Sequence, residues 1–264
     1  MSIVCLILNP RGFMTGFIPV LTFHSLDDGR APTSFGPALF ARGMETLALG
    51  GYRTISLAGA ASLAASKRPF PEKSFVITFD DGYRNIYEKA FPVLAEYSFT
   101  ATVFLTTGGG GRTGDGDRLP ELFGGEMLSW GEIRIMNDAG IDFGAHTLTH
   151  PDLTRLSPED AAREMTSSRS VIENALGAPV AAFAYPYGKY DARSLEIAAE
   201  EFSCACSDEL GLFTASSDLR AIPRVDAFYL RGERLFALVG SPNLPLYILL
   251  RGIPRTLRRR LAGI

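Results

Sequence analysis

The sequence predicts an α/β fold in which parallel strands alternate with helices. Short apolar runs of strand length recur along the 264 residues, and segments with helical spacing separate them. Seven or eight such units within about 210 residues favour a closed barrel over an open sheet, although periodicity alone allows both. With 46% hydrophobic residues, the chain can build one large core or two smaller ones.

Eight short segments are candidate strands, and most of them contain β-branched or aromatic residues. In chain order they cover residues 18–24, 52–56, 75–80, 101–106, 141–146, 181–185, 203–206 and 221–225. Catalytic residues of parallel barrels collect at the carboxyl ends of the strands. His24, Asp80, His146 and the pair Pro186-Tyr187 stand at or just beyond such ends, so we expect them on one face.

Three segments between the strands have helical spacing: 85–98, 129–139 and 157–176. Pro92 falls inside the first and is expected to start or kink a turn there. The third is the strongest, because Ser157 can cap its start and Gly177 can end it.

The strongest chemical signal is Asp80-Asp81-Gly82 together with His146 and His150, which are two of only three histidines. One aspartate and two histidines are a common ligand set for a hydrolytic zinc, and a second carboxylate can act as a base on water. Alone, Asp-Asp-Gly is more often a turn, and a histidine pair four residues apart is often a surface helix face. Together, in this order and at strand ends, they indicate a metal-dependent hydrolase.

Three segments resemble the first three motifs of the polysaccharide deacetylase family, a carbohydrate esterase family 4-like group with the chitooligosaccharide deacetylase homology domain: 78–82, 146–151 and 185–188. Residues 35–53 and Trp130 also resemble the branch that deacetylates biofilm poly-N-acetylglucosamine. The resemblance implies a distorted (β/α)7 barrel in a single domain. We expect this catalytic domain at 18–230, between an N-terminal extension at 1–17 and a basic, Leu-rich tail at 231–264.

The resemblance also implies the roles of the site residues. The metal ligands would be Asp81, His146 and His150. Zinc is the expected ion, and Co²⁺, Ni²⁺, Fe²⁺ and Mn²⁺ are also compatible. Asp80 would be the general base for metal-bound water attacking an acetyl carbonyl, and the backbone N–H of Tyr187, after Pro186, would hold the oxyanion. The implied function is removal of acetyl groups from N-acetylated sugars in poly- or oligosaccharides or lipid-linked glycans.

Two positions depart from the family pattern. Ala184 stands where most members have an arginine that steadies the base, and no histidine after residue 150 can act as the usual general acid. We expect His24 to protonate the leaving amine, because the first and last strands of a closed barrel are neighbours; the alternative is a structural histidine bonded to a carboxylate. We expect Arg224 to pair with Asp80 and orient it, the alternative being a surface ion pair with a different acid.

Other functions remain open on the residues alone. A related hydrolase could act on an O-acetyl ester or another amide, and a non-catalytic protein could bind or assemble saccharides at a membrane surface. The net charge of −3 argues against a nucleic-acid partner. Three cysteines do not suggest a disulfide framework, and Cys204 and Cys206 are expected as small core residues.

The two ends of the chain suggest where the protein acts. The N-terminus lacks the basic start of a signal peptide, so a cytoplasmic location is expected. The basic tail could contact an anionic membrane, although a C-terminal helix packed on the domain explains its pattern more simply. Pro245 and Pro254 are expected to confine any helix there to a short segment.

Overall fold

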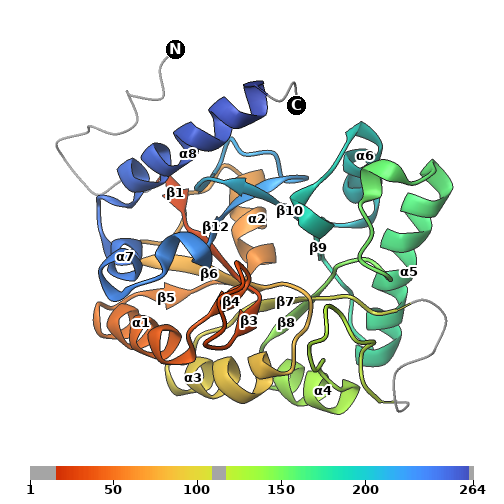
Figure 1. Ribbon diagram of the computed structural model, residues 1–264, viewed down its shortest axis with the longest axis horizontal. Coiled ribbons are helices and arrows are strands. Elements are labelled where there is room, and N and C mark those ends of the chain that lie inside the picture. Colours follow the sequence, from red (N-terminus) through yellow and green to blue (C-terminus); the bar gives the residue numbers. More distant parts are fainter. Residues whose placement is uncertain (1–15, 109–116, 262–264) are drawn as a thin grey trace.

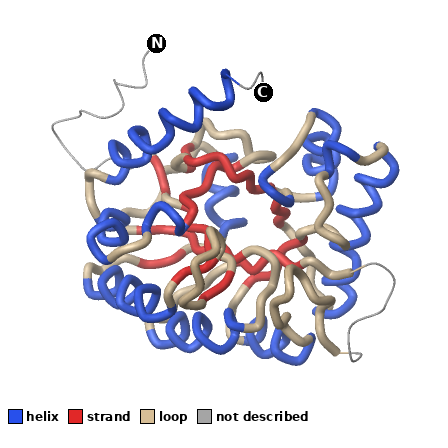
Figure 2. Tube along the Cα trace, viewed as in Figure 1, coloured by secondary structure: helices blue, strands red, loops and turns tan. Residues whose placement is uncertain are grey.

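A closed ring of seven parallel strands forms the centre of the protein, surrounded by helices (Figures 1 and 2). The computed structural model describes residues 16–108 and 117–261, with side chains up to residue 253. In order around the ring, the strands are β2 (Val20–Phe23), β6 (Ser74–Phe79), β7 (Thr102–Leu105), β8 (Asp142–Ala145), β9 (Ala182–Ala184), β10 (Cys204–Leu210) and β12 (Ile222–Asp226). β2 pairs with both β6 and β12, which closes the ring. The predicted single-domain barrel is therefore confirmed.

Shorter strands lie at the margins of the barrel. β5 (Arg53–Thr54) pairs with the start of β6. β1 (Phe17–Ile18) pairs with β11 (Phe213–Thr214), and β3 (Ser25–Leu26) pairs with β4 (Ser34–Phe35). The predicted first strand is thus interrupted, because Pro19 stands between β1 and β2.

The α-helices of the described chain are α1 (Pro37–Leu49), α2 (Leu57–Ala65), α3 (Phe91–Glu96), α4 (Trp130–Asp138), α5 (Pro158–Leu176), α6 (Ala192–Glu201), α7 (Glu233–Phe236) and α8 (Leu244–Leu261). Shorter helical turns are η2 (Ile86–Ala90), η3 (Leu153–Arg155), η4 (Pro186–Gly188), η5 (Ala227–Leu230) and η6 (Ala237–Gly240). The helix predicted at 85–98 is in fact a π-helical turn followed by α3, because Pro92 belongs in the first turn of a new helix. Ser157 caps α5, and Gly177 ends it with a positive φ.

The barrel interior changes from apolar to polar along its strands. Val20 and Val76 are buried in one cluster with Cys204 and Cys206, so the predicted core position of these two cysteines is correct. Two residues further along β6, on the same face, Thr78 is buried and begins a polar layer at the carboxyl ends of the strands. The polar chemistry is therefore concentrated at one end of a filled barrel.

The C-terminal segment differs from the expectation drawn from its prolines. α8 has Pro245 in its first turn, where a missing N–H costs nothing, and continues past Pro254, which removes only one backbone hydrogen bond. Phe236, Leu244 and Ile248 are buried in the main core. No helix in the described ranges is long and apolar enough to cross a bilayer. Most of the N-terminal extension expected at 1–17 lies outside the described residues.

Candidate active site

A cavity of about 930 Å³ opens at the carboxyl end of the barrel. It brings together seven of the eight residues that the sequence singled out: His24, Asp80, Asp81, His146, His150, Tyr187 and Arg224. Pro186, the eighth, is buried beside this cavity in the turn η4 and does not line it. A volume of this size is typical of a site for a small molecule or a segment of a polymer.

The turn after β6 orients the neighbouring carboxylates of Asp80 and Asp81 toward different partners. Asp81 has a φ of 75° and Gly82 a φ of 87°, so the chain reverses sharply directly after Asp80. A left-handed conformation at a non-glycine residue costs about 1–3 kcal/mol and is tolerated where the surroundings fix it. Both carboxylates are buried, with 3% of each residue exposed. Asp80 faces the barrel interior and Arg224, whereas Asp81 faces the two histidines.

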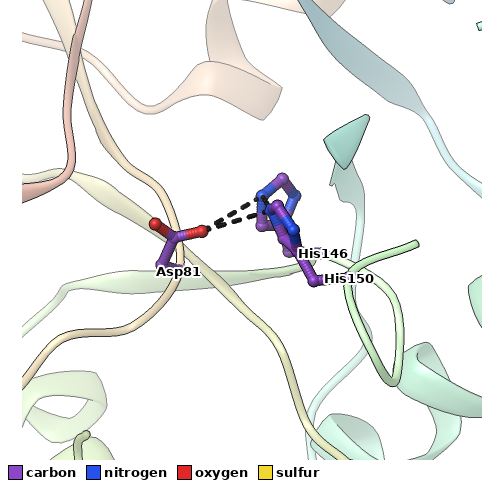
Figure 3. A group of neighbouring side chains, drawn as sticks. All are labelled: Asp81, His146 and His150. Atoms are coloured by element: carbon purple, nitrogen blue, oxygen red, sulfur yellow. Dashed lines mark hydrogen bonds and ion pairs between the residues drawn. The ribbon is translucent and has the colours of Figure 1, made fainter. Parts of the chain in front are cut away.

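Asp81, His146 and His150 direct one ligand atom each toward a common point (Figure 3). The Asp81 Oδ1 atom lies 3.5 Å from His146 Nε2 and 3.4 Å from His150 Nε2, and the two Nε2 atoms are 3.2 Å apart. A tetrahedral ion with ligand bonds of about 2.0–2.1 Å holds its ligand atoms roughly 3.3–3.4 Å apart. The three separations are close to this value, so the group fits a zinc-type ion.

The two histidines have the chemistry of metal ligands. His146 Nδ1 lies 2.7 Å from the Ala184 carbonyl oxygen, so Nδ1 carries the proton and Nε2 keeps its lone pair for a metal. Burial lowers the pKa of His150 to about 4, which keeps its ring neutral at pH 7. Burial alone would raise the pKa of Asp81. The interaction with His146 outweighs the effect of burial and lowers this pKa, so the carboxyl stays ionised.

The loop that carries both histidines is held by Glu164, which the sequence analysis did not identify. Glu164 comes from α5 and is 8% exposed. Its Oε2 accepts hydrogen bonds from the backbone N–H groups of Leu148 and Thr149, each at 2.9 Å, and its Oε1 accepts the Thr149 hydroxyl at 2.8 Å. These bonds hold a loop in which His150 has a φ of 59°. The sequence offered one sign of this role, because Glu164 is an acidic residue on the buried face of the helix predicted at 157–176.

Arg224 and Asp80 form a buried bidentate pair. Arg224 Nη1 donates to Asp80 Oδ1 at 2.8 Å, and Nη2 donates to Oδ2 at 2.7 Å. Burial alone would raise the pKa of Asp80, but the charge and hydrogen bonds of Arg224 outweigh it and hold this pKa well below its usual range. Arg224 also donates to the Ser207 carbonyl and, more weakly, to Thr78. Asp80 is therefore an ionised carboxylate in a fixed orientation.

His24 lies beside the same carboxylate, directly after β2. Its Nε2 is 3.8 Å from Asp80 Oδ2, which is too long for a hydrogen bond, and 21% of its side chain is exposed. The pairing of β2 with β12 explains how a residue from the start of the chain reaches Arg224 and its partners. His24 thus lines the cavity next to Asp80.

Exposed aromatic rings border the cavity near the histidines. Tyr187 and Phe123 are 52% and 67% exposed, and their ring centroids lie 4.7 and 5.4 Å from that of His150. Phe228, 47% exposed, lines another part of the cavity. Tyr187 has a φ of 57° within η4, directly after the buried Pro186. Rings of this kind provide apolar contact area for a ligand that is otherwise polar.

A sequence model of the polysaccharide deacetylase family matches residues 67–201, the half of the chain that contains Asp80, Asp81 and both histidines. The chain belongs to this family. The Bacillus subtilis protein YxkH, assigned to the polysaccharide deacetylases, is 28% identical over 212 residues, which cover 79% of this chain and 70% of YxkH. The Streptococcus pyogenes deacetylase PplD, solved in complex with acetate, has a similar structure, with a TM-score of 0.71 and 26% identity over 80% of this chain and 92% of PplD.

Poly-β-1,6-N-acetyl-D-glucosamine N-deacetylases of Staphylococcus aureus are 35% identical over 107 residues, or 40% of this chain. The matched part spans only 33% of the length of those enzymes. The resemblance noted in the sequence is therefore confirmed. The protein is a deacetylase-type hydrolase of carbon–nitrogen bonds, with an Asp-His-His group that could hold a metal.

Proposed function

We propose that the protein removes acetyl groups from N-acetylated sugars of a poly- or oligosaccharide, with a divalent metal, most simply zinc, held by Asp81, His146 and His150. The main support is that two adjacent carboxylates face different partners: Asp81 faces the two histidines, and Asp80 pairs with Arg224. A base and a ligand have to be different residues, because a carboxylate committed to a metal is a poor base. When bound, the metal would polarise the acyl carbonyl and acidify water.

The side chains of this chain then divide the proton transfers between them. Asp80, fixed by Arg224, accepts the proton of the attacking water. His24 donates a proton to the leaving amine, so that acetate and a free amine result. The backbone N–H of Tyr187, positioned by Pro186 in η4, donates to the oxyanion that develops on the acetyl group.

His24 is tested by its alanine variant. We expect His24→Ala to retain metal and fold but to lose most turnover, with the alkaline limb of its pH–rate profile changed. Near-normal turnover in His24→Ala, together with loss of activity in His146→Ala, would show that another group is the acid. Arg224→Lys is expected to lose activity as well, since lysine cannot form the bidentate contact.

The named activity of the Staphylococcus aureus relatives supports an N-acetylglucosamine polymer as the substrate. The test is a substrate panel of β-1,6- and β-1,4-linked N-acetylglucosamine oligomers and O-acetylated xylo-oligosaccharides, with acetate release as the readout. Release from the N-acetylated oligomers supports the proposal. Release only from the O-acetyl esters would leave the same site with an esterase function.

The cytoplasmic location expected from the N-terminus stays a prediction. Cell fractionation tests this part of the proposal, because recovery of the protein in a periplasmic or secreted fraction would contradict it.

A further inference from the structure

α8 carries an apolar stripe, defined here as Leu246, Leu249, Leu250 and Ile253, that no described residue covers. These side chains are 53%, 46%, 57% and 49% exposed. Their spacing of three, four and seven residues places them on one face of the helix. Only nine large apolar residues in the described part of the chain are exposed to this degree, and no other element has more than one of them.

The opposite face of α8 fixes the helix to the domain. Leu244 and Ile248 are 1% and 5% exposed and belong to the main core. The Tyr247 hydroxyl donates a hydrogen bond to the carbonyl of Tyr229, a residue that lines the catalytic cavity. α8 lies along one side of the barrel (Figure 1). The stripe is therefore presented outward by a helix that is already packed, and burying it requires a second surface.

The charge around the stripe indicates the kind of surface. Residues 234–264 contain six arginines and no acidic residue, although the whole chain has a net charge of −3. Five of these arginines, at 251, 255, 258, 259 and 260, lie within or directly after the stripe. An exposed apolar helix face within an arginine-rich segment is suited to the boundary of a bilayer with anionic headgroups, where each arginine adds to the attraction.

Two other occupants fit the charge less well. A second copy of α8 would bring two arginine-rich segments together, which is unfavourable. Residues 1–15 are apolar but contain no acid that could pair with the arginines. We propose that α8 attaches the protein to an anionic lipid surface, with the apolar stripe inserted at the headgroup boundary and the arginines on the headgroups. This attachment does not depend on the identity of the glycan.

The experiment uses the full chain and two kinds of vesicle, phosphatidylcholine alone and phosphatidylcholine with an equal amount of phosphatidylglycerol. Flotation should show binding to the anionic vesicles at least about tenfold tighter than to the neutral ones, and this binding should weaken as salt is added. The double variant Leu249→Gln/Leu250→Gln should lose more than about tenfold in affinity, because half of the stripe is removed. Replacing Arg255, Arg258 and Arg259 by Gln should also weaken binding to the anionic vesicles.

Matched controls come from exposed apolar residues on other helices. Leu49 on α1 and Ile135 on α4 are 82% and 52% exposed, so Leu49→Gln/Ile135→Gln should bind vesicles as the wild type does. All variants should retain the wild-type melting temperature and the wild-type acetate release from a water-soluble oligomer.

Equal binding to both vesicles, or equal loss in the stripe variant and its control, would overturn the proposal. A concentration-dependent dimer that Leu249→Gln/Leu250→Gln abolishes would assign the stripe to a second copy instead. Binding that appears only after removal of residues 1–15 would show that the chain covers its own stripe.

Discussion

Replacing Arg224 by methionine should lower the free energy of unfolding by about 3–5 kcal/mol, because it leaves the Asp80 carboxylate buried without its partner. Arg224 is 4% exposed and donates four hydrogen bonds: two to Asp80, at 2.8 and 2.7 Å, one to Ser207 and one to Thr78. A hydrogen bond to a charged group contributes about 1.5–3 kcal/mol, so the Asp80 contacts alone account for most of the loss. Asp80 can take up a proton in the variant, which limits the cost.

A double-mutant cycle separates this pair from other effects of the substitution. Urea unfolding would be measured in chelator for the wild type, Arg224→Met, Asp80→Asn and the double variant. Each single variant leaves one member of the pair buried without its partner, whereas the double variant leaves no unpaired member. The double variant should therefore be more stable than the sum of the single losses predicts, by about 1–3 kcal/mol. A loss below about 1 kcal/mol in Arg224→Met, or additive losses, would refute a strong buried pair.

Three further outcomes are expected. Glu164→Ala should weaken metal binding by about 10- to 100-fold in a competition titration with a chelator, because the ligand loop loses its anchor, and unchanged affinity would contradict that role. Gly188→Ala should destabilise the fold in thermal melts by at least about 1 kcal/mol, because a Cβ there lies 2.5 Å from the Asp208 backbone N and the φ is 63°. Hydrogen bonds from Ser129 and Arg84 outweigh burial and lower the pKa of Glu132. The stabilisation from Glu132 is therefore present above its usual pKa and lost as the pH falls through the lowered value, so the stability difference from Glu132→Gln should shrink in acid.

The barrel and the Asp-His-His group could be anticipated because their signals are local. A buried strand such as β6 is a continuous apolar run, and the polar residues that follow it are next to it in the sequence. Asp80, Asp81 and His146 are therefore placed by the ends of the strands alone. The resemblance to a known family then separated the two carboxylates into a ligand and a base.

Other parts of the site depend on contacts that no local pattern encodes. Glu164 binds backbone groups 15 and 16 residues away across a loop; its place on the buried face of its helix is unusual for an acid but does not identify these partners. Arg224 could be suspected only because Ala184 stands in the place of the usual arginine. The continuation of α8 through Pro254 was missed, because the prolines suggested an end where only one hydrogen bond is lost.

The most direct test of the proposed function compares wild type and Asp80→Asn in the same assay, with metal content and acetate release from N-acetylglucosamine oligomers measured on each sample. Both proteins should carry about one metal ion per chain, on the ligand set of a single site, and only the wild type should release acetate. Acetate release by Asp80→Asn near the wild-type rate would contradict the assignment of Asp80 as the base. Loss of the metal from Asp80→Asn would contradict the assignment of Asp80 as a base that does not bind the metal.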